Sequence, residues 1–306
     1  MSLVKNETEL IVILGPTASG KTRLAVNLAA ILDGEIISAD SRQVYKGMDI
    51  GTGKDLSEYQ FEGKKIAHHL IDICEAGEKY NVAFFQKDFL RCFLDIQQRG
   101  KFPILCGGTG LYIQSALSEM WQIQVPVDEK FRKDFETMGK DDLSLMLKSE
   151  DIKYDISTKK RLIRGLEIEK FLNENADFEP QTGNNINYKI FGFNPELNIR
   201  RDRISKRLKF RFENEGLLEE VRGLLESGLT FEMLDYYGLE YRYIGLFLKN
   251  EMSFEEMFGK LETEIHRYAK RQMTFFRSME RKGFEINWIP DNLDENEKLR
   301  FIIDSL

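Results

Sequence analysis

The chain has 306 residues, of which 42% are hydrophobic and 31% are charged, and its formal net charge is −7. This length is enough for one large domain or two, and the composition is that of a globular protein. No apolar run approaches the ~20 residues of a membrane span, and the first residues lack the apolar centre of a signal peptide. We therefore expect a cytoplasmic protein without membrane contact, and its acidic balance argues against indiscriminate binding of polyanions.

The first predicted elements enclose a glycine-rich loop. Residues 9–14 form an apolar run that predicts a buried strand, and residues 23–32 have helical apolar spacing. Between them, GPTASGKT has the full spacing of a phosphate-binding loop. In that motif backbone N–H groups face an anion, Lys21 reaches its outer oxygens and the Thr22 hydroxyl can ligate Mg²⁺. The motif leaves open whether the anion is ATP, GTP or another diphosphate. The predicted anion-binding residues are Gly15, Pro16, Thr17, Ala18, Ser19, Gly20, Lys21 and Thr22.

A second predicted strand, residues 34–40, ends in the acid Asp40. Residues 82–99 have helical spacing, 102–106 form another apolar strand, and 107–120 are a glycine turn that enters a helix. Strands that alternate with helices predict an α/β fold with a parallel sheet, here of the P-loop kinase-like type. Ligands of such sheets bind at the carboxyl ends of the strands, so Asp40 should face the phosphate-binding loop as a metal support or a general base.

The other predicted strand ends lack the acid that supports the metal in nucleotide hydrolases. Residues 102–106 end in Cys-Gly-Gly, and a later predicted strand, 188–193, ends in Asn194 and Pro195. Asp40 is therefore the acid found at a predicted strand end, and the alternative to a chemical role is that it only caps the local structure.

Cysteine and histidine give no sign of a metal centre. The three cysteines are far apart in the sequence and form no CxxC pair, so neither a disulfide framework nor a zinc site is indicated. His68 and His69 are neighbours in a predicted extended segment, where adjacent side chains point to opposite faces. We expect local hydrogen bonds there rather than a shared metal. The cysteines are Cys74, Cys92 and Cys106.

The strand pattern disappears between residues 121 and 187, which predicts a helical insertion. We accordingly divide the chain into a core, residues 1–120, the insertion, and a continuation of the core, residues 188–306. Within the insertion we expect helices over 128–138, 141–148 and 157–173, and then a polar loop over 173–185. Beyond the strand at 188–193, helical patterns cover 199–227, 241–249 and 253–279.

Positive charge is concentrated in two of the later helical patterns. Residues 200–211 hold seven basic side chains against one acid, a net +6, and residues 266–282 hold six against one, a net +5. Stretches of this density are either solvated helix faces or sites for phosphate-rich partners. In the second stretch Tyr268, Phe275 and Phe276 alternate with the cations, as stacking surfaces for nucleic-acid bases would.

Seven blocks, in order and over almost the whole chain, resemble the motifs of the bacterial tRNA dimethylallyltransferases, also called tRNA isopentenyltransferases. Several of these blocks are specific to that family, whereas the phosphate-binding loop is widespread. The blocks are GPTASGKT (15–22), ISADSRQVYKGMDIGT (37–52), HHLID (68–72), GGTGLY (107–112), RLIRGLEI (161–168), GLLEEV (216–221) and YAKRQMTFFR (268–277).

The resemblance implies that the loop binds the diphosphate of dimethylallyl diphosphate together with Mg²⁺. The five-carbon group would move to N6 of the adenine 3′ of the anticodon, and Asp40 would accept the N6 proton. Thr109, in the GGTGLY block, would help to place the adenine or the diphosphate. Arg207 would reach the diphosphate from the other side, although the spacing keeps Arg203 and Arg211 as alternatives. The implied catalytic residues are Asp40, Lys21, Thr109 and Arg207.

The resemblance also implies a tRNA partner, bound at the anticodon stem-loop by a monomeric enzyme. The target base must leave its stack to reach an enclosed centre, and the helical insertion would close on the stem. The segments that match tRNA-contacting parts of the family contribute Asp40, Ser41, Arg42, Gln43, Lys160, Arg161, Arg164, Arg267, Lys270, Arg271 and Gln272.

Two blocks depart from the family pattern: 49–55 is DIGTGKD instead of DIGTAKP, and 238–243 is GLEYRY where GY(K/R)(E/Q) is expected. They leave the diphosphate chemistry intact but bear on the acceptor, so a paralogue with another tRNA preference is an open alternative. A small-molecule kinase and an adenylate isopentenyltransferase would share the phosphate-binding loop. A non-catalytic RNA-binding module would not need Lys21, Thr22 and Asp40 together.

Overall fold

The computed structural model describes residues 8–147, 156–179 and 185–306. The chain divides into two compact units, one formed by Met1–Leu117 with Asn185–Leu306 and the other by Ser118–Asn184. The predicted insertion, residues 121–187, overlaps almost completely with this second unit. Lys148, at the end of a predicted helix, and residues 180–184 of the predicted polar loop lie outside the described residues.

The first unit contains a six-stranded sheet of order β5-β2-β6-β1-β7-β8, in which every pairing is parallel. The prediction of an α/β fold with a parallel sheet is therefore confirmed. A separate antiparallel pair, β3 (Gln60–Phe61) and β4 (Lys64–Lys65), lies outside this sheet. The strands of the sheet are β1 (Leu10–Leu14), β2 (Gly34–Ser38), β5 (His68–His69), β6 (Phe102–Gly107), β7 (Tyr188–Phe193) and β8 (Ile286–Ile289).

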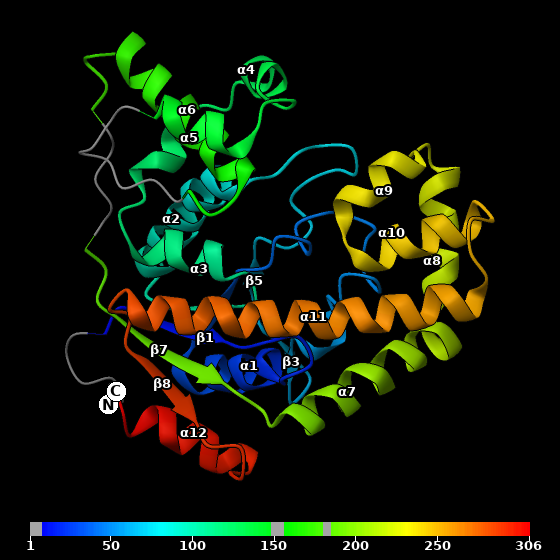
Figure 1. Ribbon diagram of the computed structural model, residues 1–306. Coiled ribbons are helices and arrows are strands. Elements are labelled where there is room, and N and C mark those ends of the chain that lie inside the picture. Colours follow the sequence, from blue (N-terminus) through cyan, green and yellow to red (C-terminus); the bar gives the residue numbers. More distant parts are fainter. Residues whose placement is uncertain (1–7, 148–155, 180–184) are drawn as a thin grey trace. The chain divides into compact units, whose positions relative to one another are not determined.

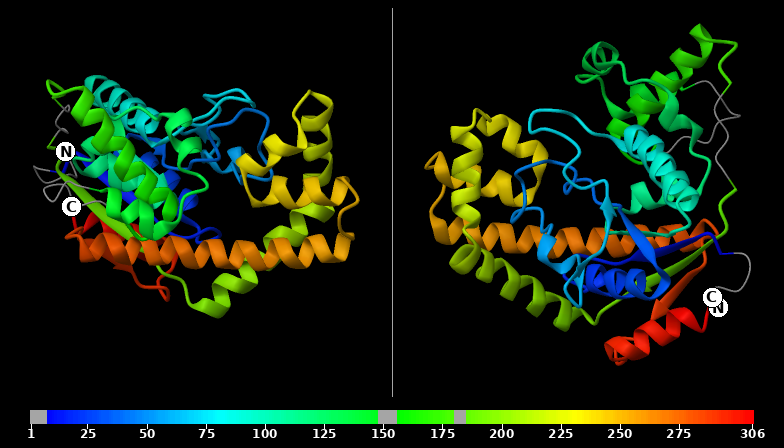
Figure 2. Two further views of the ribbon diagram at one scale, coloured as in Figure 1. Left: turned by 45° about the horizontal axis from the view of Figure 1, so that its top comes forward. Right: turned by 180° about the vertical axis from the view of Figure 1, so that it is seen from behind.

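Helices cover both faces of the sheet. Successive side chains of β1 point to opposite faces, so they belong to two separate cores. Leu10, Val12 and Leu14 belong to the core shared with α2 (Val82–Gln98), α3 (Gly110–Leu117) and α11 (Phe254–Arg281). Ile11 and Ile13 belong to the core shared with α1 (Lys21–Leu32) and α12 (Glu295–Ile303). Figure 1 shows α11 crossing the first face, and the rear view in Figure 2 shows α1 and α12 on the other.

The predicted continuous helix over 199–227 is wrong. The chain forms α7 (Leu197–Phe210), one π-helical turn (Arg211–Glu215) and α8 (Leu217–Glu226). Gly216 separates them with a left-handed φ of 79°, a conformation that glycine adopts without strain. Two shorter helices follow, α9 (Phe231–Tyr237) and α10 (Leu239–Leu248), and the sequence predicted only the second.

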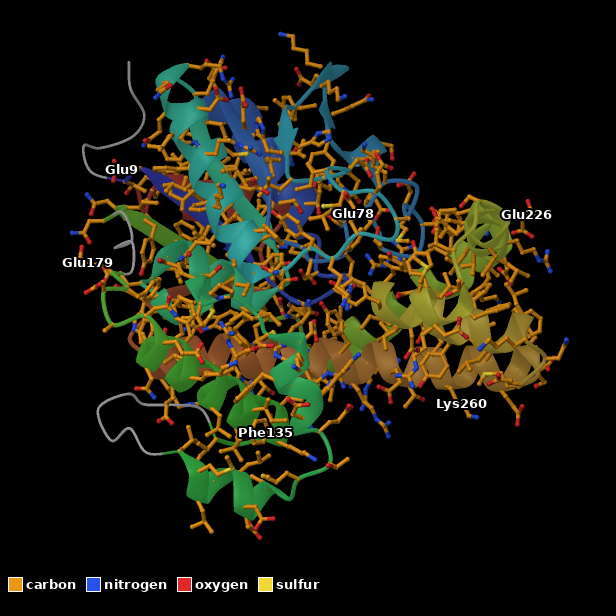
Figure 3. All side chains as sticks on the ribbon, turned by 90° about the horizontal axis from the view of Figure 1, so that it is seen from above. Glu9, Glu78, Phe135, Glu179, Glu226 and Lys260 are labelled. Carbon is orange, nitrogen blue, oxygen red and sulfur yellow. The ribbon has the colours of Figure 1, made fainter. Side chains whose placement is uncertain are left out.

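The second unit has its own small core, and the regular elements among its described residues are all helices. It contains a 3₁₀ turn (Trp121–Gln124), α4 (Glu129–Asp134), α5 (Lys140–Met146) and α6 (Lys159–Glu174). Leu143, Leu162 and Leu166 pack together with Phe131 and Phe135, whose rings lie 4.6 Å apart. Figure 3 labels Phe135 within this unit.

Among the described residues, no helix is both long and apolar enough to cross a membrane.

Candidate active site

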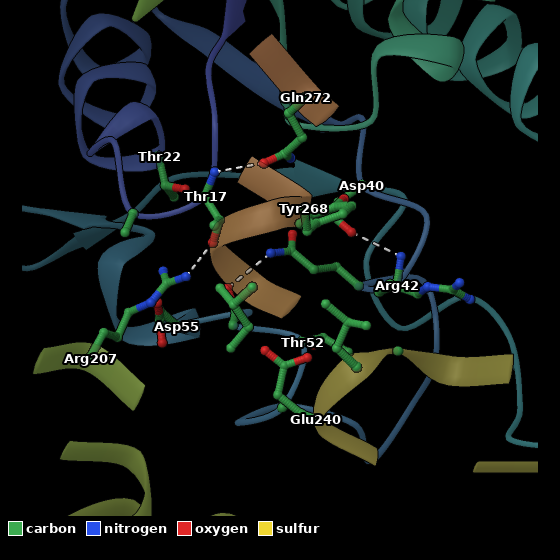
Figure 4. Close-up of a pocket in the computed structure, with 18 of the residues that line it drawn as sticks. Thr17, Thr22, Asp40, Arg42, Thr52, Asp55, Arg207, Glu240, Tyr268 and Gln272 are labelled. Carbon is green, nitrogen blue, oxygen red and sulfur yellow. Dashed lines mark hydrogen bonds between the residues drawn. The ribbon is translucent and has the colours of Figure 1, made fainter. Parts of the chain in front are cut away.

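A cavity of about 550 Å³ lies where the carboxyl ends of β1 and β2 meet α7, α10 and α11. Figure 4 shows the side chains that line it. Most of them come from the phosphate-binding loop, from residues 40–43 after β2, from the loop 51–55 and from these three helices. The sheet thus brings the loop and Asp40 to one space, as the order of the predicted strands indicated.

The loop after β1 has the backbone of an anion site. Ala18 and Gly20 have left-handed φ angles of 60° and 84°, and α1 begins directly afterwards at Lys21. A Cβ on Gly15 would lie 2.8 Å from Ser19 Oγ and 2.9 Å from Phe193 Cβ, so the turn is too tight for another residue. Ser19 Oγ is buried and has no hydrogen-bond partner among the described residues. Such a concave backbone at a helix N-terminus, with an unused hydroxyl, suits a phosphate group.

Two cations approach the loop from different sides. Lys21 Nζ donates to the Pro16 carbonyl at 3.4 Å, and burial lowers the pKa of this ammonium while the nearby Asp40 raises it. Arg207 extends from α7 and donates to the Thr17 hydroxyl (Figure 4). Burial lowers the pKa of Arg207 to about 10, helped by the neighbouring charge of Arg211. Arg207 therefore remains charged near neutral pH and is the arginine that touches the loop.

Asp40 stands two residues beyond the end of β2, and its Oδ1 accepts the Arg42 backbone N–H at 2.9 Å. Its carboxylate lines the cavity. Thr109 lies behind it, because the Thr109 hydroxyl accepts the Ser41 backbone N–H at 3.0 Å. Thr109, expected to help place the adenine or the diphosphate, is not among the residues that line the cavity; its hydroxyl instead fixes the backbone beside Asp40.

Gln272, expected in an RNA-contacting segment, occupies the interior and is 6% exposed. Its side-chain oxygen accepts the Thr17 backbone N–H at 2.9 Å, and its amide nitrogen donates to the Gly108 carbonyl at 2.9 Å. One side chain of α11 therefore connects the phosphate-binding loop to the turn after β6. No sequence signal indicated this role, since the partners are 255 and 164 residues away.

The loop 49–55 forms another wall of the cavity and is held by three side chains. Glu220, from the GLLEEV block on α8, accepts the backbone N–H groups of residues 49, 50 and 51 at 2.7 to 3.0 Å. Lys54 is buried and donates to the Tyr45 carbonyl and to Asp49 Oδ1, both at 2.6 Å. Gln43, one of the predicted RNA-binding residues, donates to the Gly53 carbonyl at 2.9 Å. These contacts hold this wall of the cavity in place.

The GLEYRY block contributes a carboxylate that sequence reasoning missed. Gly238 joins α9 to α10 with φ 146° and ψ 177°, a conformation open essentially to glycine alone. The turn places Glu240 in the cavity wall, where Figure 4 labels it. Burial raises the pKa of Glu240, and the charges of Arg211 and Arg207 oppose that shift.

Three other predicted RNA-binding residues of the first unit lie on exposed surface, and Ser41 and Arg42 are half-buried. Arg267, Lys270 and Arg271 project from α11, where Arg267 pairs with Glu264. Arg42 donates to the Tyr236 carbonyl and lies 5.4 Å over the Tyr236 ring. Ser41, Arg42 and Arg271 line the cavity as well, so this basic surface reaches its rim.

In the second unit, Lys160 and Arg161 are exposed at the start of α6. Arg164 is used internally instead. It donates to the carbonyls of Gln122 and Val125 at 2.7 Å each, and it also pairs with buried Glu167. Its guanidinium therefore fastens the chain before α4 to α6.

The expected local hydrogen bond forms at His68, whereas the partner of His69 lies on the neighbouring strand β2. His69 Nε2 lies 2.7 Å from a Glu35 oxygen, and His68 Nδ1 lies 3.3 Å from the Ile66 carbonyl. Within the described ranges the cysteines are free thiols, and no group of three His, Cys, Asp or Glu side chains could hold a metal ion.

Comparison with known proteins gives this site a family. The model "IPP transferase" matches residues 43–279, and "Isopentenyl transferase" matches residues 8–67. A protein of Parabacteroides distasonis named tRNA dimethylallyltransferase 1 is 50% identical over 294 residues, with 95% of each chain covered. One of Bacteroides fragilis named tRNA dimethylallyltransferase 2 is 47% identical, with 96% of each chain covered.

A solved structure agrees with these sequence matches. The crystal structure of the tRNA isopentenylpyrophosphate transferase of Bacillus halodurans is similar with a TM-score of 0.72 and 33% identity. The match covers 98% of this chain and 95% of that one. The order of sequence blocks, the cavity at the strand ends and the near-complete coverage lead to one conclusion: this chain belongs to the IPP transferase family, the tRNA dimethylallyltransferases.

Proposed function

We propose that the protein transfers the dimethylallyl group of dimethylallyl diphosphate to N6 of the adenine 3′ of the anticodon in tRNA. The observation that carries this proposal is the meeting of Asp40 with Lys21, Thr22 and Arg207 in one cavity. An amine can be deprotonated at one side of this space while a diphosphate leaves at the other.

The leaving group determines what the phosphate-binding loop does. N6 attacks C1 of the allylic chain, the C1–O bond breaks, and the electron pair of that bond stays on the diphosphate. The growing negative charge would be met by Lys21, by the loop amides and by Arg207. These groups are already in place, so they stabilise the transition state without reorganising.

The proton that N6 loses goes to the Asp40 carboxylate. A carboxylate can accept it because the attacking amine becomes strongly acidic as the new C–N bond forms. Thr109 acts through the backbone, since its hydroxyl fixes Ser41 next to Asp40.

Mg²⁺ fits this site as a companion of the diphosphate. The described residues contain no cluster of three side chains that could hold a metal alone, whereas the Thr22 hydroxyl lines the cavity at the start of α1. Mg²⁺ commonly takes one or two protein ligands and completes its shell with phosphate oxygens and water. When bound, it would neutralise part of the diphosphate charge.

The acceptor would be held by basic side chains at the rim of the cavity. Arg42, Arg267, Lys270 and Arg271 would contact backbone phosphates of the anticodon loop, and the exposed Lys160 and Arg161 of the second unit would contact the stem. Tyr268 lines the cavity below this surface and offers its ring to the adenine that leaves the stack. An enzyme of this kind works where tRNA is, so we place it in the cytoplasm.

The substitution Asp40→Asn separates a base from a metal support. Asparagine keeps the size of the side chain and can still accept the Arg42 N–H, but it cannot take a proton. We expect the single-turnover rate to fall about 10²- to 10⁴-fold while Mg²⁺-diphosphate affinity changes little. Asp33→Asn, at the exposed end of α1, is the matched control.

Rescue of Asp40→Asn by added Mg²⁺ would assign the carboxylate to the metal instead. Mass spectrometry of tRNA nucleosides, with and without the gene, tests the function itself through N6-isopentenyladenosine. Turnover of ATP without any prenyl transfer would favour a kinase.

A further inference from the structure

Arg211 is a buried charge next to the cavity whose partners are distant. Its side chain is 4% exposed, and it begins the π-helical turn that follows α7. Nη2 lies 3.5 Å from Asp55 and Nε lies 3.7 Å from Glu215, and neither nitrogen makes a hydrogen bond to a described residue. A guanidinium buried in this way loses its hydration, and such long contacts replace that loss only in part. The burial of this charge therefore indicates a role beyond packing.

The loop opposite Arg211 is shaped around this guanidinium. Gly53 has a left-handed φ of 66°, and a Cβ built there would lie 2.6 Å from Arg211 Nη2. The guanidinium thus occupies the space where a side chain would stand. Asp55, two residues further along, also has a positive φ, 40°, which residues other than glycine adopt only at a cost in conformational energy. Between them, buried Lys54 fastens the loop from its other side.

Arg211 is also one helical turn beyond Arg207. Residues four apart on a helix share a face, so both guanidinium groups point from α7 toward the cavity that they line. Arg207 donates to Thr17 in the phosphate-binding loop. The π-helical turn begins at Arg211, directly after the last turn of α7, which carries Arg207. Contacts that hold Arg211 in place therefore also hold the helical turn of Arg207 in place. Such π-turns are frequent at functional sites.

We propose that Gly53, Asp55 and Arg211 form a clamp that positions Arg207 against the phosphate-binding loop. Here Arg211 is a positioning residue: Asp55 and Glu215 orient it and Gly53 gives it room, while Arg207, and not Arg211, contacts the diphosphate. The clamp rests on the proposed transfer from dimethylallyl diphosphate, because its effect is read at the donor. It also gives a role to the sequence GTGKD, because its second glycine, Gly53, and its aspartate, Asp55, are the two residues that this loop contributes to the clamp.

The first test is a pair of glycine substitutions. Gly47→Ala and Gly53→Ala both place a side chain at a left-handed φ, 70° and 66°, but only the second meets Arg211, since nothing lies within 4 Å at Gly47. We expect Gly53→Ala to raise the donor KM roughly ten- to a hundredfold, because a small misplacement of a positioned group has that effect. Gly47→Ala should change the donor KM less than about twofold. Gly53→Ala should change the KM for an anticodon stem-loop by no more than that. Equal effects of the two glycines would overturn the clamp.

The second test uses Asp55→Asn, which disturbs no backbone and covers the case in which Gly53→Ala fails to fold. It should raise the donor KM about tenfold in the wild-type background, but less than about twofold when Arg207 is already alanine, because coupled residues are not additive. Additive losses would show that Arg211 or Asp55 meets the donor independently, which overturns the positioning role. An unchanged donor KM in Asp55→Asn would do the same.

Binding of inorganic diphosphate with Mg²⁺, measured by calorimetry, makes the two proposals separable. If the wild-type protein shows no prenyl transfer, the proposed function fails, and the clamp is then judged from diphosphate affinity in the same variants. If transfer is normal and Asp55→Asn leaves both KM and affinity unchanged, only the clamp fails.

Discussion

Replacing Glu220 by glutamine should weaken the fold at the wall of the cavity. Oε2 of Glu220 accepts the N–H groups of Asp49 and Ile50, and Oε1 accepts that of Gly51 and the Tyr241 hydroxyl at 2.8 Å. Glutamine keeps one acceptor oxygen and turns an NH₂ group toward the other pair, so two hydrogen bonds to a charged acceptor are lost.

Each such bond contributes about 1.5–3 kcal/mol, but the site is partly solvated, so we expect a loss of about 2–4 kcal/mol in the free energy of unfolding. Urea titration measures that loss, and hydrogen exchange should show faster exchange of the amides of residues 49–51. Glu219→Gln is the control, since Glu219 is 66% exposed and its ion pair with Arg222 is 3.6 Å long. A Glu220→Gln protein as stable as that control, with unchanged exchange, would refute this account of the loop.

Three further outcomes follow from the site and its surroundings. Lys21→Ala should abolish prenyl transfer, measured with radiolabelled donor, because the leaving diphosphate loses its buried cation; wild-type turnover would remove the loop from the mechanism. Charge removal at Arg267, Lys270 or Arg271 should flatten the salt dependence of stem-loop binding by about one unit of slope for each phosphate that is no longer neutralised, and an unchanged slope in all three variants would leave this face as solvated surface. Arg99 and His69 lower the pKa of buried Glu35 from 4.5 to about 2, so its stabilisation is complete above about pH 4.5 and disappears toward pH 2. With Arg99 half exposed, this is worth about 1–2 kcal/mol, and urea midpoints that fall with acid as steeply in Glu35→Gln as in the wild type would contradict it.

The central strands could be predicted because burial leaves a mark in the sequence. Residues 9–14 and 102–106 are continuous apolar runs, as expected for strands covered on both faces, and both became central strands. β8 was missed because INWI has only four residues, one of them the polar Asn287, and its place depends on pairing with β7. The break at Gly216 could have been predicted, since a glycine at this position commonly ends a helix.

The positions of Asp40 and the phosphate-binding loop followed from the motif and the strand order alone. The roles of Gln272, Arg164 and Glu240 did not, because each depends on partners that lie far away in the sequence. Gln272 belongs to a basic stretch that predicts RNA contact, yet its side chain is buried while those of Arg267, Lys270 and Arg271 are exposed. On a helix, one or two positions decide whether a polar side chain meets solvent or another element.

The segments that carry Asp40 and the phosphate-binding loop are held together by backbone hydrogen bonds and by the side chain of Gln272. Ala39 donates to the Cys106 carbonyl at 2.8 Å and accepts the Thr109 N–H at 3.1 Å, so the peptide before Asp40 is held by the turn after β6. Gly107 and Gly108 allow this closeness, because a Cβ on the first would collide with the Ala39 carbonyl and one on the second with Gln272. Gln272 in turn holds Thr17. Asp40, the phosphate-binding loop and α11 are therefore parts of one hydrogen-bonded unit, which holds the groups that line the cavity in fixed positions relative to one another.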